Sequence, residues 1–160
     1  MPTNAAVQLR RFPVLRWRRG VVAGLVAVSL SCGCSGLPGG TEGDLSRAAA
    51  DAASATASAR LGLSLVSAHR TTGNHAEVVL DDALESVLTS YRAAATAETS
   101  SQDESEHQDV LLGYLDDAAS VLGRARGHVA GVPGSPDAAS LDEELGRLTD
   151  TLSSFGEGAR

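Results

Sequence analysis

The 160-residue sequence contains no lysine, and all 13 of its basic side chains are arginines. Aromatic residues make up only 3% of the chain, so a folded core must be built from leucine, valine and alanine rather than from large rings. Only two cysteines occur, Cys32 and Cys34, and no acidic residue precedes Glu42. The absence of lysine, with heavy use of alanine and glycine, is typical of a GC-rich bacterium, and the length leaves room for one domain.

The charges divide the chain into a basic leader and an acidic body. Five arginines and no acid lie before residue 40, whereas the chain after Cys34 carries eight arginines and 20 acidic residues, which gives 8 − 20 = −12. Such a body has nothing with which to neutralise phosphates, so nucleic-acid binding is not expected. The same charge disfavours contact with anionic lipid and favours solubility.

The leader has the order of a secretory signal. Residues 1–20 are polar and rich in arginine, residues 21–30 are apolar without a charge, and small residues follow. A membrane-spanning helix needs about 20 apolar residues, and this run is shorter and contains Gly24. A processed signal is therefore predicted rather than a permanent span.

The end of the leader, Ser31-Cys32-Gly33-Cys34-Ser35, resembles a bacterial lipoprotein signal peptide. In that family a cysteine that follows small residues is lipidated and becomes the first mature residue. The resemblance implies lipidation of Cys34 and a signal peptide over residues 1–33, with Cys32 as the alternative acceptor. Cys32 stands where Ser, Ala or Thr is usual, and Leu30 lies one place early. Two acyl chains would hold the body firmly at a membrane.

The expected location is the outer face of the cytoplasmic membrane within the cell envelope, with a secreted form as the alternative. Arg18-Arg19-Gly20-Val21-Val22 resembles a twin-arginine export signal, and the general secretory route is the other possibility. Residues 34–43 are rich in glycine and contain Pro38, which predicts a flexible tether.

Beyond the tether, four segments show helical periodicity and none alternates as a strand would. Asp44 is the expected cap of the first segment, which ends near Arg70, and Asn74-x-x-Glu77 and Ser101-x-x-Glu104 resemble capping boxes of the next two. Ser135-Pro136-Asp137 is expected to start the fourth, which stops at Gly156. The expected core positions follow heptad-like spacing in each segment: Leu45, Ala49, Ala52, Thr56, Ala59, Leu63 and Val66; Leu80, Leu84, Val87, Tyr91 and Ala94; Leu111, Leu115, Ala118, Leu122, Ala125 and Val129; Ala138, Leu141, Leu145, Leu148, Leu152 and Phe155.

Short connections favour antiparallel neighbours. The predicted fold is therefore an all-α, up-down-up-down antiparallel four-helix bundle over residues 44–156. Gly113, Gly123 and Gly127 lie inside the third segment and are expected to make it the most easily frayed or bent.

This topology places His69, His75 and His128 at one end of the bundle, where they are weak candidates for metal ligands. Solvated histidines at helix ends are the simpler interpretation. Glu104-x-x-His107 matches half of a di-iron motif, but the sequence has no second Glu-x-x-His. No resident cofactor or metal is expected.

No catalytic motif stands out in the sequence. It contains no Gly-x-Ser-x-Gly elbow, phosphate loop or dinucleotide fingerprint, and its acid pairs fit solvated helix faces. The expected function is a non-enzymatic interaction or accessory role, through an envelope partner or self-association along the Ala-rich first segment. A bundle that binds a small molecule or a metal is the alternative.

Overall fold

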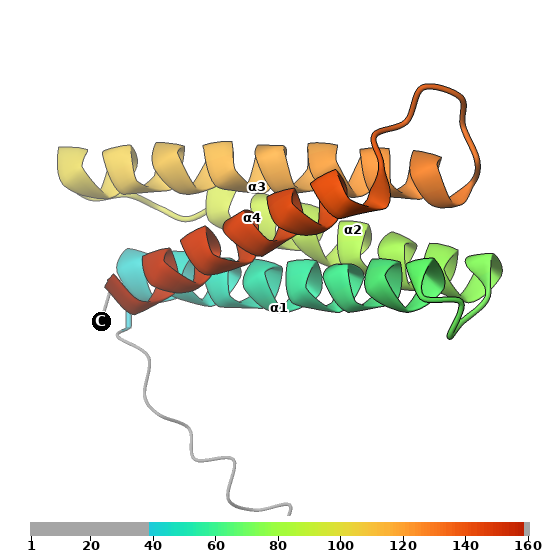
Figure 1. Cartoon of the computed structure of the whole chain (residues 1–160). Helices are drawn as coiled ribbons and strands as arrows, with labels where there is room; N and C mark the ends of the chain where they lie inside the picture. The colour runs from blue at the N-terminus through green and yellow to red at the C-terminus, as the bar shows by residue number, and fades with distance from the viewer. Residues whose placement is uncertain (1–38, 159–160) are drawn as a thin grey trace, which may run out of the picture. The chain divides into compact units, whose positions relative to one another are not determined.

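The computed structural model describes residues 39–158, and this part of the chain consists of four α-helices and no strand (Figure 1). The helices are α1 (Thr41–Ser67), α2 (Gly73–Ala95), α3 (Gln102–Val129) and α4 (Ala138–Gly158). Short loops join them, and consecutive helices run in opposite directions. The predicted all-α four-helix bundle is confirmed. The leader, with Cys32 and Cys34, lies outside the described residues.

Each helix packs against two neighbours around one core. α1 and α3 both contact α2 and α4, and α1 also contacts α3 across the centre of the bundle. α4 runs obliquely, from the loop after α3 toward the beginning of α1 (Figure 1). α1 and α3 are therefore the two helices that contact all three others.

Leucine provides most of the volume of the core, as the scarcity of aromatic residues requires. The leucines that are completely buried come from all four helices: Leu45, Leu63, Leu80, Leu111, Leu115, Leu122, Leu141, Leu145 and Leu152. Burying a side chain of this size stabilises the fold by about 1.5–3 kcal/mol. In α1 the predicted core positions from Leu45 to Leu63 are all buried, and Val66 is partly buried.

The predicted core face of α2 is wrong at Tyr91, whose side chain is 37% exposed. Ala83 and Ser90 are buried instead, and Leu84 is only partly buried. The physical reason is the spacing of the buried residues of α2, which recur every three or four positions as Leu80, Ala83, Val87, Ser90 and Ala94 and so leave Tyr91 beside the buried face. Elsewhere along this interface the two helices approach closely. A Cβ built on Gly62 of α1 would lie 3.0 Å from Cγ1 of Val79 on α2, so no large side chain fits between the two helices there.

The first two helices begin elsewhere than predicted. α1 begins at Thr41 rather than at Asp44, and the Thr41 hydroxyl donates a 2.6 Å hydrogen bond to the Glu98 carbonyl. This contact with the loop after α2 extends the helix toward the tether. α2 is capped by Thr72, whose hydroxyl accepts the His75 N–H at 3.3 Å, so the predicted capping box at Asn74 is wrong.

One of the two hydrogen bonds of the predicted capping box of α3 is confirmed, and the other has a different donor. The Ser101 hydroxyl accepts the Glu104 N–H at 3.2 Å, as predicted. The Glu104 carboxylate, however, accepts from the backbone N–H of Ser100 at 2.6 Å and from the Ser100 hydroxyl at 2.8 Å, not from Ser101. These hydrogen bonds hold the pKa of Glu104 below its usual range.

α4 is capped by Asp137 rather than by Ser135. One Asp137 oxygen accepts the N–H groups of Ala139 and Ser140, each at 3.0 Å, and the pKa of Asp137 falls because Ser140 and Ala139 donate to it. The helix starts at Ala138 and continues to Gly158, two residues beyond the predicted end. The bundle therefore spans residues 41–158 instead of 44–156.

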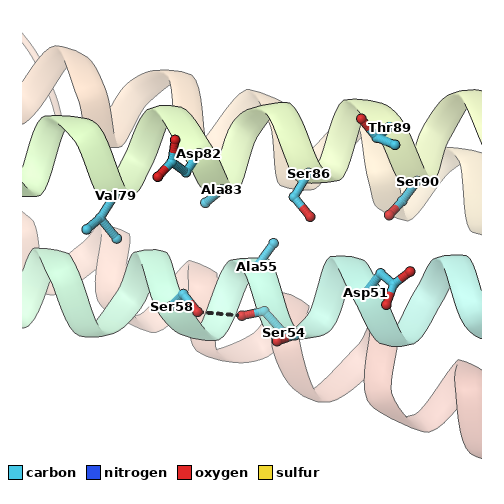
Figure 2. A pocket seen from close by; sticks show the side chains of 10 residues that line it. All are labelled: Asp51, Ser54, Ala55, Ser58, Val79, Asp82, Ala83, Ser86, Thr89 and Ser90. Carbon is cyan, nitrogen blue, oxygen red and sulfur yellow. Dashed lines mark hydrogen bonds between the residues drawn. The ribbon is translucent and has the colours of Figure 1, made fainter.

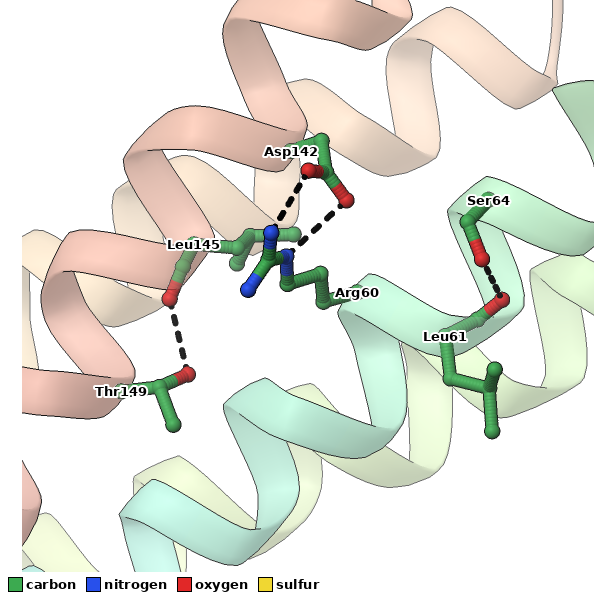
Figure 3. Close-up of polar contacts among 6 residues, drawn as sticks. All are labelled: Arg60, Leu61, Ser64, Asp142, Leu145 and Thr149. Atoms are coloured by element: carbon green, nitrogen blue, oxygen red, sulfur yellow. Dashed lines mark hydrogen bonds and ion pairs between the residues drawn. The ribbon is translucent and has the colours of Figure 1, made fainter.

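Polar contacts between side chains connect α4 to α1. Arg60 of α1 makes two 3.0 Å hydrogen bonds to the carboxylate of Asp142 (Figure 3). The Thr149 hydroxyl lies 2.8 Å from the Leu145 carbonyl and 3.0 Å from the Thr56 hydroxyl of α1. Because Arg60 and Asp142 are partly exposed, their ion pair adds little to the free energy of unfolding. Its main effect is to set the position of α4 on α1.

Alanine at Gly113 or Gly123 is expected to raise the free energy of unfolding by about 1 kcal/mol per substitution. α3 is one uninterrupted helix of 28 residues, and a Cβ at either position would meet nothing within 4 Å. The gain comes from lower backbone entropy in the unfolded chain. Urea unfolding of Gly113→Ala and Gly123→Ala measures it, and a loss of stability in both variants would contradict the packing described for α3.

Candidate functional site

A groove between α1 and α2 is lined by Ser90, one of three buried polar residues in the described chain. One cavity of about 490 Å³ lies between the two helices, and a second of about 300 Å³ continues it toward the C-terminal end of α2. Asp51, Thr89 and Ser90 line both cavities, which makes them parts of one groove. Figure 2 shows the residues that line the larger cavity, among which Ala55, Ser86 and Ser90 point into the space between the two helices.

Small side chains on facing turns create this groove. Ala55 of α1 and Ala83 of α2 form its floor and are 8% and 2% exposed. Ser54 and Ser58 line it from α1, and Ser86 lines it from α2. Leucine at these positions would fill the space, so the groove follows directly from the Ala- and Ser-rich composition of α1 and its partner face.

Ser90 is the most informative residue of the groove. Its side chain is 5% exposed, and its hydroxyl makes no hydrogen bond with any part of the chain that the structure describes. Other helical hydroxyls, such as those of Thr56 and Thr96, bond to a carbonyl one turn back. The Ser90 oxygen keeps contact with solvent in the groove, toward which it points in Figure 2, so water serves as its hydrogen-bond partner.

Two carboxylates mark the ends of the larger cavity. Asp51 lies near Ser90, and Asp82 lies near Ser58 at the opposite end (Figure 2). The seven residues from position 51 to position 58 of α1 correspond to about 10 Å along the helix axis. Within residues 39–158 neither carboxylate belongs to an ion pair, and no arginine lines this cavity.

A second groove, between α3 and α4, differs because an ion pair crosses it. This cavity of about 360 Å³ is lined by Tyr114, Arg124 and Glu144, among others. Arg124 Nη1 lies 3.2 Å from Glu144 Oε1, and this contact lowers the pKa of Glu144 and raises that of Arg124. Tyr114 also packs edge-to-face on Phe155 with 6.4 Å between ring centres. The Arg124–Glu144 pair and the Tyr114–Phe155 contact therefore connect α3 to α4 along this groove.

The histidines predicted to share one end of the bundle do not assemble a metal site. His69 follows α1 with a φ of 53° and is exposed, His75 is exposed in the first turn of α2, and His128 is partly buried in the last turn of α3. Across residues 39–158, no three His, Cys, Asp or Glu side chains come together closely enough to hold a metal ion.

Sequence reasoning missed the contacts of His107. Its Nδ1 lies 3.1 Å from Glu42 Oε1, which connects α3 to the first turn of α1, and its ring packs edge-to-face on Phe155 at 6.4 Å. The sequence separation of 65 residues hides this pair. Only the orientation of α1 relative to α3 brings the two residues together.

Among residues 39–158, none of the helices combines the length and the apolar character needed to span a bilayer. No protein-family model, no curated protein and no solved structure matches the chain.

Proposed function

We propose that the chain is an exported bacterial lipoprotein whose helical body acts outside the cytoplasmic membrane by binding rather than by catalysis. The observation that carries this proposal is the leader. An arginine-rich start, a short apolar run and Cys34 after Gly33 precede the body in the order of a lipoprotein signal. Diacylation of Cys34 would anchor the acidic body to the membrane.

The position of α1 supports a tethered arrangement. α1 begins at Thr41, seven residues after Cys34, and the intervening residues are mainly glycine, serine and proline. Thr41 and Glu42 connect the first turn to Glu98 and His107. A pull on the tether would therefore be transmitted to the loop after α2 and to α3, not to α1 alone.

Substitution of Cys34 by serine is expected to move the full-length chain out of the membrane fraction, because serine provides no thiol for acylation. The measurement is immunoblotting of membrane and soluble fractions from bacterial cells that express the full-length chain. Cys32→Ser serves as the matched control and is expected to leave the chain in membranes. If Cys32→Ser releases the chain and Cys34→Ser does not, the alternative acceptor is correct. Retention of both variants would contradict lipid anchoring.

The contacts of the threonine hydroxyls and of the His107 ring favour binding over catalysis. Hydroxyls of Thr56, Thr149 and Thr151 contact carbonyls of their own helices, and His107 contacts a carboxylate and a ring. The described residues show no serine or threonine within hydrogen-bond distance of a histidine side chain, as a nucleophile and its base require. The proposed role is an interaction or accessory function at the envelope.

A second function, binding of a small molecule by the bundle, is favoured by one observation. The α1–α2 groove gathers the Ser90 hydroxyl and the carboxylates of Asp51 and Asp82 in one cavity, and neither carboxylate forms an ion pair within residues 39–158. Convergent polar groups in an otherwise methyl-lined groove are characteristic of ligand sites.

A further inference from the structure

We propose that the outer face of α1 is the contact surface between two copies of this chain, with the two α1 helices side by side and antiparallel. The inference rests on the proposed binding role and names the partner, a second copy of the chain. It depends neither on the lipid anchor nor on a ligand in the α1–α2 groove. Within residues 39–158, α1 contacts α2, α3 and α4, and its outer face has no helix against it.

Leu61 and Val78 form the apolar centre of this face. Their side chains are 59% and 56% exposed, the largest values among the large hydrophobic residues of the described chain. Leu61 precedes Gly62 in α1 and Val78 precedes Val79 in α2, and Gly62 and Val79 meet where the two helices are closest. Figure 3 shows the Leu61 side chain directed away from α4. Exposed apolar side chains that gather in this way mark contact surfaces.

Leu61 also belongs to a second heptad-like row of α1, on the side opposite its buried row. The spacing of this row is 4-3-4-3-4, and all of its members are exposed and uncharged: Ala50, Ser54, Ala57, Leu61, Ser64 and Ala68. This is the spacing of helices that pair along their length. A helix with uncharged rows on opposite sides is normally covered on both, whereas within one copy α1 is covered on one side only.

The sizes of the residues in this row match a second copy in antiparallel orientation. A two-fold axis midway between Ala57 and Leu61 places Leu61 of each copy against Ala57 of the other, so a large side chain always meets a small one. The next layer on either side pairs Ser54 with Ser64. A two-fold interface brings the same patch of both copies together, as this pairing does. Small residues in the contact let two helices approach to about 8 Å.

The charges at the two ends of α1 favour the same orientation. Asp51 lies on the N-terminal half of α1 and Arg70 just beyond its C-terminal end, and neither belongs to an ion pair within residues 39–158. In the antiparallel pairing Arg70 of each copy comes level with Ala48 of the other. Ala48 is three residues from Asp51, or about 5 Å along the helix, which the arginine side chain spans. Parallel pairing would instead place Asp51 beside Asp51, two like charges.

Sedimentation velocity of the full-length chain, purified in a neutral detergent, tests the contact. The chain is expected to change from monomer at about 1 μM to dimer at about 100 μM, with a Kd on the order of 10 μM, because a single pair of helices forms a small interface. A chain that stays monomeric throughout this range would overturn the proposal.

Two matched variants assign the dimer to α1. Leu61→Arg puts a charge at the centre of the contact and is expected to weaken dimerisation at least about tenfold. Val110→Arg is the control, since Val110 is 47% exposed on α3, and it is expected to leave dimerisation unchanged. Both residues are exposed, so both variants are expected to keep the helical circular dichroism of the unmodified chain. A dimer that survives Leu61→Arg would overturn the assignment to α1.

Cysteine cross-linking tests the orientation, in full-length chains that carry Cys32→Ser and Cys34→Ser. Ser54→Cys and Ser64→Cys are made in separate chains, and both positions are exposed. The antiparallel pairing predicts a disulfide-linked dimer when the two variants are mixed under mild oxidation, and none from either variant alone, because only the mixture brings two thiols within bonding distance. Variants that cross-link with themselves would show parallel pairing and overturn the proposed arrangement.

These results are independent of the test of the lipid anchor. A chain that stays monomeric, but leaves the membrane on Cys34→Ser substitution, would overturn the dimer and keep the anchored lipoprotein. A chain that forms the mixed cross-link, but whose Cys32→Ser and Cys34→Ser variants both stay in membranes, would support the α1 contact and overturn the anchor.

Discussion

Replacement of Leu115 by alanine is expected to lower the free energy of unfolding by about 2–5 kcal/mol. Leu115 is completely buried in the middle of α3 and belongs to the leucine core that all four helices share. The substitution removes apolar surface from the core and leaves a cavity that the surrounding helices fill only in part. A domain of this size is stabilised by about 5–15 kcal/mol in total, so a large share of its stability is expected to disappear.

Urea unfolding followed by circular dichroism measures this loss, and Leu61→Ala provides the matched control. Leu61 lies on α1 with 59% of its surface exposed, so the same chemical change there is expected to alter stability by about 0.5 kcal/mol or less. Equal effects of the two substitutions would contradict the placement of Leu115 in the core. The reverse order would mean that α1 and α3 present other faces to each other.

Leucine at Gly156 is expected to destabilise the bundle by about 1–3 kcal/mol, because it overpacks the contact between α4 and α1. Even a Cβ at this position would lie 3.3 Å from the backbone oxygen of Ser46 and 3.8 Å from the Ala49 side chain. A backbone atom inside a helix cannot move aside as a flexible side chain does. The Ser46 hydroxyl also donates a 2.6 Å hydrogen bond to the Gly156 carbonyl in this buried contact, and separation of the helices would break it.

Gly113→Leu separates overpacking from the general effect of replacing a helical glycine. Position 113 also lies within a helix, but a Cβ there has no neighbour within 4 Å, so leucine is expected to be neutral or stabilising. Thermal unfolding of both variants gives the difference. A stable Gly156→Leu variant would show that α4 does not approach α1 closely at its C-terminal end.

The sequence predicted the fold and most of its core because leucine spacing alone determines which face of each helix is buried. The spacing succeeded in α1, α3 and α4, where regularly spaced residues such as Leu45, Leu115 and Leu145 are completely buried. It failed at Tyr91 in α2, because the pattern gives weight to large apolar residues. The actual contact between α1 and α2 depends on small residues, including Ala83 and Ser90.

The helix starts were predicted less well, since several polar residues near each start can act as a cap. Thr72 and Asp137 cap α2 and α4, although Asn74 and Ser135 were expected from the same local sequences. Local sequence shows that a helix begins nearby. The choice among adjacent polar residues depends on the path of the incoming loop, which distant contacts determine.

The candidate groove could not be derived from the sequence. Asp51 and Asp82 each fit a solvated helix face, and their relation appears only when α1 and α2 are aligned in antiparallel register. One signal was available: serines and threonines recur on α1 and α2 at helical spacing, including Ser54, Ser58, Ser86 and Ser90. Only the structure shows which of these hydroxyls bond to their own helix, as the Ser58 hydroxyl does to the Ser54 carbonyl.

Mass spectrometry of the full-length gene product, isolated from bacterial membranes, tests the proposed lipid anchor most directly. The expected product begins at Cys34, lacks residues 1–33 and carries a diacylglyceryl group on that cysteine. A product that begins at Cys32 with the same modification would move the acceptor by two residues. A chain that retains residues 1–33, or that begins elsewhere without a lipid, would contradict the proposal that this helical bundle is tethered to the envelope.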